Sequence, residues 1–291
     1  MSEKDIAEKA LVKQNDIFAD IANALLFQGE QHIQPEDLVD APTTYMYDAD
    51  STVHEQERDV AKLWKNHDVV LSLIGVENQT NICNDMPLRI IGYDGAAYRT
   101  QLLNKKVLSR TEKRYPVISI VLYSGKKRWK SNRSLKECLK VPPILEPFVN
   151  DYKVNVFELA HLTEEQIKFF QSEYRIIAYN YTHDSVKGNE ELLNIPIKHR
   201  YETFKLLSIV NKNEQYINFA EEDLGGETNM CDFYEYAESK GKIAGRTEAT
   251  NSFAIDMIKD GISAKMIQKY TKLSMERLEE IAKSLNTTLV L

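Results

Sequence analysis

The stretch DVAKLWKNHDVVLSLIGVENQ, residues 59–79, decides the fold of this chain. Two apolar segments in it flank the tetrapeptide KNHD, which is typical of a turn. We therefore predict a β-hairpin, with one strand over residues 59–64 and the second over residues 69–77. The propensities of residues 55–64, EQERDVAKLW, also permit a helix, so this alternative stays open.

The second strand of the hairpin ends in polar residues. Side chains alternate between the faces of a strand, so Glu77 and Gln79 share a face and Asn78 points away. A tight hairpin lays Asp59 opposite Glu77, and two carboxylates that close are unfavourable unless a cation lies between them. Oxygen ligands without thiolate or imidazole suit Mg²⁺ or Mn²⁺, so we expect a divalent ion here. The alternative is that Asp59 is a turn residue and that Glu77 is solvated.

The remaining segments predict an α/β core with a mixed sheet flanked by helices. Polar loops are expected at 30–42 and at 48–58. Residues 163–220 have a mostly helical pattern, with a loop at 183–196. In chain order we expect a helix over 5–27, a strand over 43–48, the hairpin, a helix over 86–105, strands over 116–125 and 154–160, and a helix from 163 to about 181.

Three regions are expected along the chain: a core over 1–182, a helical extension and linker over 183–229, and a helical tail over 230–291. Within the tail, residues 258–281 have the rhythm of two short helices joined by a turn at KLS. Such a pair suits a helix-turn-helix DNA reader or an element of a homo-oligomer. Acids offset the lysines of this region, which favours the protein–protein role.

Charge is distributed unevenly along this acidic chain, whose net charge is −7. Residues 104–140, here called the basic zone, hold twelve Lys or Arg and two acids, so the zone carries +10 and the remainder carries −17. A concentrated basic zone is what local attraction of DNA phosphates needs, whatever the total charge. The alternative is a solvated face without a partner.

Targeting and redox features predict a cytoplasmic protein. No apolar run is long enough to cross a membrane, and the charged first residues carry no secretory signal. The three cysteines are widely spaced and form no CxxC pair, so neither a zinc site nor a disulfide framework is expected.

An Asp, a hairpin and then Glu-x-Lys at the end of the next strand form the signature of the PD-(D/E)XK nuclease fold, here Asp59 followed by Glu77-Asn78-Gln79. The chain resembles one branch of it, the recombination-promoting nuclease (Rpn) family, whose members are also labelled putative transposases. The resemblance covers about residues 8–181. The motifs that carry it are NDIFADIANALLF (15–27), ERDVAKLW (57–64), GVENQT (75–80), MPLRIIGYDGAAYRTQL (86–102), YPVISIVLYSGKKRW (115–129) and DYKVNVFEL (151–159).

The resemblance implies roles for the residues of the hairpin. Asp59 and Glu77 would be catalytic metal ligands, joined by the backbone carbonyl of Asn78. Gln79 stands where the fold usually has lysine; its amide orients a water but supplies no positive charge. Lys62 is no substitute, since three positions from Asp59 it faces the other way.

Further roles follow from the same resemblance. An acid of the first helix often joins the metal, and we expect Asp20 there, with Asp16 second; both also suit a surface or capping role. Arg89 and Tyr93, one turn apart, would contact a phosphate, although an Arg lying over a Tyr at the surface is as plausible. The residues expected to bind the DNA backbone in the basic zone are Lys105, Lys106, Lys126, Lys127 and Arg128.

The function implied is that of a Mg²⁺- or Mn²⁺-dependent DNA endonuclease, without strong sequence specificity, in recombination, mobile-element biology or defence. The first alternative is a weak or inactive relative that binds DNA or a protein, which Gln79 and the acidic total charge favour. A true transposase ranks last, because a strand-transfer enzyme normally shows three spaced acids on an RNase H-like fold.

Overall fold

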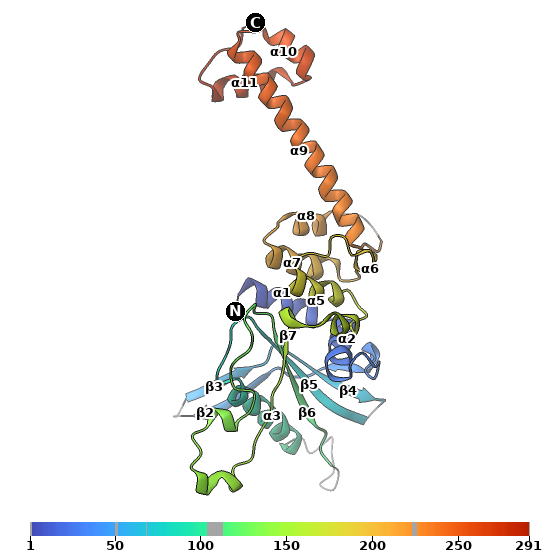
Figure 1. Cartoon of the computed structure of the whole chain (residues 1–291), viewed down its shortest axis with the longest axis vertical. Helices are drawn as coiled ribbons and strands as arrows, with labels where there is room; N and C mark the ends of the chain where they lie inside the picture. Colours follow the sequence, from blue (N-terminus) through green and yellow to red (C-terminus); the bar gives the residue numbers. More distant parts are fainter. Residues whose placement is uncertain (1, 50–51, 68, 104–112, 223–225, 291) are drawn as a thin grey trace. The chain divides into compact units, whose positions relative to one another are not determined.

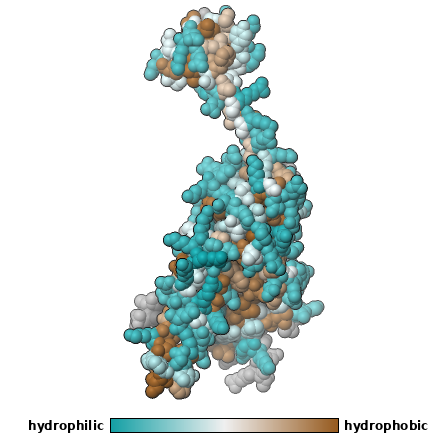
Figure 2. All heavy atoms as spheres, viewed as in Figure 1, coloured by the Kyte–Doolittle hydropathy of each residue, from teal (hydrophilic) through white to brown (hydrophobic). Residues whose placement is uncertain are grey.

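The computed structural model describes residues 2–49, 52–67, 69–103, 113–222 and 226–290 of the chain. The chain divides into two compact units, Met1–Met230 and Cys231–Leu291. In the described part, no helix combines the length and the apolar character needed to cross a membrane. Polar residues cover most of the face seen in Figure 2.

A five-stranded mixed sheet forms the centre of the first unit (Figure 1). Its spatial order is β1-β4-β5-β6-β7, with antiparallel pairs between β1 and β4 and between β4 and β5 and parallel pairs from β5 to β7. These strands are β1 (Leu38–Asp40), β4 (Val60–Asn66), β5 (Val69–Gln79), β6 (Val117–Tyr123) and β7 (Asn155–Glu158). The predicted hairpin is confirmed as β4 and β5, and the helical alternative for residues 55–64 is wrong.

Two strands lie where the sequence predicts polar loops. The strand β1 falls within the expected loop 30–42, and β3 (Thr52–Glu57) falls within the expected loop 48–58. The predicted strand 43–48 is confirmed as β2 (Thr44–Ala49), which pairs with β3 in a separate two-stranded sheet. Polar composition misled the prediction, because the pairing of β1 with β4 and of β3 with β2 leaves no apolar periodicity in the sequence.

Two of the predicted helices are each divided into two shorter helices in the structure. The expected helix 5–27 is two helices, α1 (Glu3–Val12) and α2 (Asn15–Leu26), because Gln14 adopts an extended conformation with ψ of 133°. The helix expected from 163 to 181 is also two, α4 (Glu164–Lys168) and α5 (Tyr174–His183). The helix α3 (Met86–Leu103) is confirmed.

Shorter helices complete the first unit: α6 (Glu190–Leu193), α7 (Arg200–Asn211), α8 (Gln215–Glu221), and the 3₁₀ turns η1 (Pro35–Asp37), η2 (Lys136–Cys138), η3 (Pro143–Phe148) and η4 (Leu159–His161). The second unit holds α9 (Met230–Lys259), α10 (Ala264–Thr271) and α11 (Met275–Ser284). The predicted pair of short helices around KLS is confirmed as α10 and α11. They enclose a core that includes Ile258, Ile267 and Leu278.

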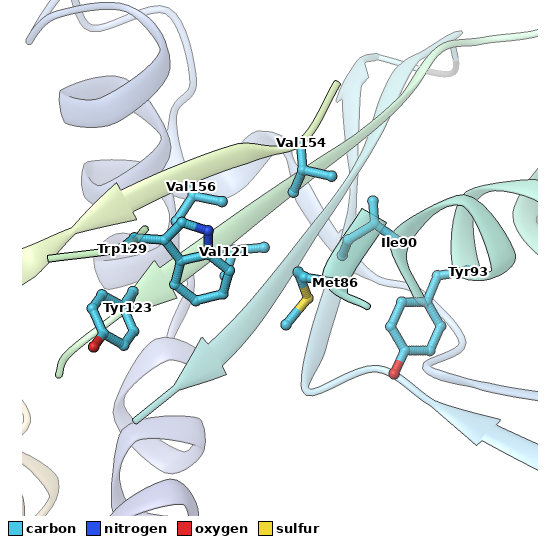
Figure 3. Close-up of a cluster of buried hydrophobic side chains, with 8 residues drawn as sticks. All are labelled: Met86, Ile90, Tyr93, Val121, Tyr123, Trp129, Val154 and Val156. Carbon is cyan, nitrogen blue, oxygen red and sulfur yellow. The ribbon is translucent and has the colours of Figure 1, made fainter. Parts of the chain in front are cut away.

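One hydrophobic cluster fixes α3 against the sheet (Figure 3). Met86, Ile90 and Tyr93 of α3 pack with Val121 and Tyr123 of β6. The other buried members are Trp129, Val154 and Val156. This packing sets the position of Tyr93, and therefore of Arg89 one turn earlier, beside the end of β5.

Lys62 lies on the opposite face of the hairpin, as predicted. Its side chain is only 2% exposed, its ammonium lies 5.9 Å from the centre of the Phe18 ring, and it donates a 2.6 Å hydrogen bond to Asp40 of β1. Lys62 therefore packs against α2 and ties the edge strand to β4, away from Glu77.

We expect Asp40→Ala to lower the free energy of unfolding by about 1–3 kcal/mol, because it leaves the buried Lys62 ammonium without its carboxylate. Lys62→Met is expected to be milder, since it removes the buried charge itself. Urea unfolding of both variants checks this, with the exposed Glu36→Ala as control. Equal losses for Asp40→Ala and Glu36→Ala would contradict it.

Candidate active site

The hairpin brings Asp59 and Glu77 together. Val60 pairs with Val76, so Asp59 and Glu77 are the next residues on the two antiparallel strands. Asp59 Oδ2 accepts a 2.8 Å hydrogen bond from the backbone amide of Asn78. The two carboxylates thus lie at the carboxyl end of β5, where the sequence placed them.

The Glu77 carboxylate is buried, and few polar contacts replace the water that it loses. Its side chain is 2% exposed, and its Oε1 atom has no hydrogen-bond partner. Burial, and after it the charge of Asp59, raise the pKa of Glu77 to about 8. Burial also raises the pKa of Asp59, opposed by the hydrogen bond from Asn78. A bound cation would relieve both effects, since it favours the charged form of each carboxylate.

This arrangement fits a divalent cation. The donors of the pair are carboxylate oxygens, the ligands that Mg²⁺ and Mn²⁺ prefer, and one of them is buried and unpartnered. In a strand, the N–H and C=O of one residue face the same neighbour. Because the Asn78 N–H reaches Asp59, the Asn78 carbonyl faces that side of the strand too.

Arg89 and Tyr93 of α3 lie beside Glu77. A guanidinium nitrogen of Arg89 lies 3.4 Å from Glu77 Oε2 and donates a 3.2 Å hydrogen bond to the Tyr93 hydroxyl. The Arg89 side chain is 39% exposed, so its cation is reachable from solvent while touching the buried acid. The predicted pair is therefore next to the carboxylates, where an incoming phosphate would meet a positive charge.

A buried ion pair beneath the site was not predicted from the sequence. Arg58 and Asp94 are each 1% exposed, and they are joined by a 2.6 Å contact. Asp94 also accepts hydrogen bonds from the hydroxyls of Ser119 and Tyr152. The Arg58 guanidinium lies 5.2 Å from the centre of the Tyr93 ring, and its charge lowers the pKa of Glu77.

Gly75 is the sequence signal that indicates this pair. A Cβ atom at Gly75 would lie 2.0 Å from a guanidinium nitrogen of Arg58, so only glycine leaves space for the Arg58 side chain over the strand. An isolated glycine inside a strand often marks such a close approach. Arg58 thus runs across β5 one residue before Asp59 and reaches α3.

Gln79 ends β5 two residues after Glu77, opposite Tyr123 of β6. Its backbone carbonyl accepts hydrogen bonds from the backbone amide and the hydroxyl of Ser124, at 2.8 and 3.3 Å. The backbone at this position is therefore fixed, and the half-buried side chain extends from a rigid strand end.

Asp20 is not brought to this pair, which corrects the sequence-based expectation. Its carboxylate accepts hydrogen bonds from the Gln171 amide and from the amide and hydroxyl of Ser172, where α4 ends. Asp16 instead contacts His199 at 2.7 Å. Asp20 is thus a structural acid that satisfies amides released by the break between α4 and α5.

Helix α1 also contributes charge near the site, besides Arg89 of α3. Its Lys9 and Asp5 act electrostatically on Asp59, Lys9 lowering its pKa and Asp5 raising it. Among the described residues, no group of three or more His, Cys, Asp or Glu is placed to hold a metal. The carboxylates that the structure brings together at this strand end are therefore Asp59 and Glu77.

The basic zone is partly neutralised by acids from elsewhere. Lys105 and Lys106 lie outside the described residues. Lys126 contacts Asp184 at 2.9 Å, and Arg128 lies 4.0 Å from Glu158. Lys127 is exposed. The Lys126 pair is at the surface and weak, whereas Arg128 shares the largely buried Glu158 with Arg133.

Comparison with known proteins supports the resemblance predicted from the sequence. Residues 61–194 match the family described as putative transposase, YhgA-like. The matched segment includes Glu77, Asn78 and Gln79, and Asp59 lies just before it. No curated protein and no solved structure gives a significant match to the chain.

Proposed function

We propose that this chain, whose residues 61–194 match the family described as putative transposase, YhgA-like, is a metal-dependent DNA endonuclease of the PD-(D/E)XK type. The observation that carries the proposal is the pairing of Asp59 with Glu77, whose buried Oε1 has no partner. Mg²⁺ or Mn²⁺ would be held by these carboxylates and the Asn78 carbonyl.

The chemistry proposed is hydrolysis of a phosphodiester. A bound divalent ion supplies an activated water and stabilises charge developing on the phosphate. Gln79 orients the attacking water through its amide, from a backbone fixed by Ser124. Arg89 offers a solvent-reachable cation to the phosphate. Lys127 and its neighbours in the basic zone hold the DNA backbone without reading sequence.

The test is cleavage of supercoiled plasmid by the full chain with Mg²⁺, Mn²⁺ or EDTA. We expect nicking that needs the metal and that falls at least about 100-fold in Glu77→Ala, because the metal loses its buried ligand. Glu214→Ala, an exposed acid of the same unit, serves as the matched control. Cleavage that survives in Glu77→Ala, or that persists in EDTA, overturns the proposal.

A second candidate is a nuclease-fold protein that binds DNA or a protein without cutting. The observation that favours it is Gln79, which supplies no charge where the fold usually has lysine. Plasmid that stays intact with every metal, together with DNA binding retained in Glu77→Ala, would indicate this function. A three-acid transposase finds less support, since the described residues bring only two acids together at this strand end.

Arg89→Met is expected to reduce the single-turnover cleavage rate about tenfold, because the phosphate loses its nearest proposed cation. Arg89→Lys should recover part of that loss, since it restores a charge without the planar fork. The matched control is Arg99→Met, an exposed arginine of the same helix. Equal rates for Arg89→Met and Arg99→Met would remove Arg89 from the site.

A further inference from the structure

A cavity of about 650 Å³ opens beside the candidate active site, at the carboxyl ends of β5 and β6. The crevice at the carboxyl ends of parallel strands is where open α/β sheets commonly bind ligands. One wall is apolar, with Ile82, Ile209 and Val210. The volume lies within the range of small-molecule sites and far exceeds what a lone phosphate needs.

A half-buried lysine lies in the polar part of this cavity. Lys4 of α1 has a side chain 18% exposed, and its ammonium donates a 2.7 Å hydrogen bond to the Ser124 hydroxyl. The same ammonium lies 4.9 Å from the centre of the Tyr181 ring and 3.7 Å from Glu8. Burial raises the pKa of Glu8, so this acid neutralises Lys4 less than an exposed carboxylate would.

Two more cations stand at the mouth of the cavity. Lys126 and Lys127 line it and are exposed, together with one acid, Asp184. The pair of Lys126 with Asp184 joins side chains that are 81% and 79% exposed, so it is held weakly. The lining therefore carries three lysines against one aspartate, which suits an anionic ligand.

The cavity is continuous with the strand end that carries Glu77. Thr80 and Asn81, which follow Gln79 directly, line it, and Ser124 binds the Gln79 carbonyl. Three residues of strand separate Glu77 from Thr80, about 10 Å. A strand of DNA placed with one phosphate at Glu77 would therefore bring a neighbouring nucleotide to this cavity.

We propose that this cavity binds a single unpaired nucleotide of the DNA strand, with its phosphate at Lys4 and Ser124 and its sugar and base against the apolar wall. The inference rests on the proposed function, because DNA at the candidate active site is what delivers the nucleotide. It implies that single-stranded or frayed DNA is preferred to a fully paired duplex, whose bases are held in the stack.

The first test measures binding of deoxyadenosine monophosphate to the full chain in EDTA, by calorimetry, so that cleavage is not involved. We expect binding that weakens at least tenfold in Lys4→Gln and is blocked in Val210→Trp, which fills the cavity. Glu77→Ala should bind as the unaltered chain does. The matched control is Lys13→Gln, an exposed lysine just after the same helix.

The second test is competition against the bound nucleotide, with single-stranded and fully paired oligonucleotides of one sequence. We expect the single strand to compete better, and Lys4→Gln to abolish the difference. No binding of the nucleotide, an equal loss in Lys13→Gln, or a free nucleotide that no oligonucleotide displaces would each overturn the inference. If the nucleotide binds but plasmid is not cleaved, the proposed endonuclease function is refuted and nucleotide binding in the cavity stands. If Lys4→Gln cleaves DNA as the unaltered chain does, the cavity does not hold a nucleotide of the DNA strand during cleavage, and the proposed endonuclease function stands.

Discussion

Asp94→Asn is expected to lower the free energy of unfolding by about 3–5 kcal/mol, because it leaves Arg58 as an uncompensated buried charge. Both side chains of the pair are 1% exposed, so water cannot replace the lost carboxylate. Arg58 already has two buried nitrogens, Nε and Nη1, without a hydrogen-bond partner. The substitution keeps the shape of the side chain and changes its charge.

Urea unfolding with a common slope checks this expectation, with Asp85→Asn, an exposed acid just before α3, as the matched control. The double variant Arg58→Met with Asp94→Asn should recover a large part of the loss, because it removes the stranded charge. If the double variant is as unstable as Asp94→Asn, charge burial is not the cause. Gly75→Ala should also destabilise the fold, since its Cβ would overlap Arg58.

Local periodicity predicted the central hairpin and α3 from the sequence, because each is a contiguous segment with an apolar pattern, although residues 55–64 also permitted a helix. Residues 69–79 form the central strand β5, buried between β4 and β6. The edge strand β1 was missed because three residues with one buried side chain give no periodicity. Helix breaks at Gln14 and after Lys168 depend on tertiary partners such as Asp20, which local patterns do not contain.

The candidate site was also predicted only in part from the sequence. Asp59 and Glu77 could be expected near each other because they lie at the open ends of one hairpin, but their alignment depends on a register shift between Trp64 and Lys65 that the sequence does not reveal. The expectation that Arg89 lies near the site followed from the family resemblance, and helical spacing indicated only that Arg89 and Tyr93 lie one turn apart. Asp20 was misplaced because its contacts lie more than 150 residues away in sequence. The Arg58–Asp94 pair joins the residue just after β3 to α3, and Gly75 is the sequence signal that could have indicated it.

Glu77→Gln is expected to stabilise the metal-free protein increasingly as pH rises, by up to about 5 kcal/mol above pH 8. The pKa of Glu77 is about 8 in the folded chain, raised chiefly by burial from an ordinary value of 4.5. Between these values the folded state holds a proton that the unfolded state has released. Stability must therefore fall as pH rises through this window, by about 1.4 kcal/mol per pH unit.

Glutamine has no proton to lose, so the variant lacks this fall, and the two unfolding free energies should converge below about pH 4.5. Urea unfolding in EDTA at pH 5, 6, 7 and 8 measures the divergence, with Glu214→Gln as an exposed control. Adding Mg²⁺ should stabilise only the unaltered chain, and more strongly at high pH, because the ion requires the charged carboxylate. Parallel pH profiles for Glu77→Gln and the unaltered chain would show that Glu77 is ionised at neutral pH. Burial would then be offset by Arg58 and Arg89, and the unpartnered oxygen would need no cation to stabilise it.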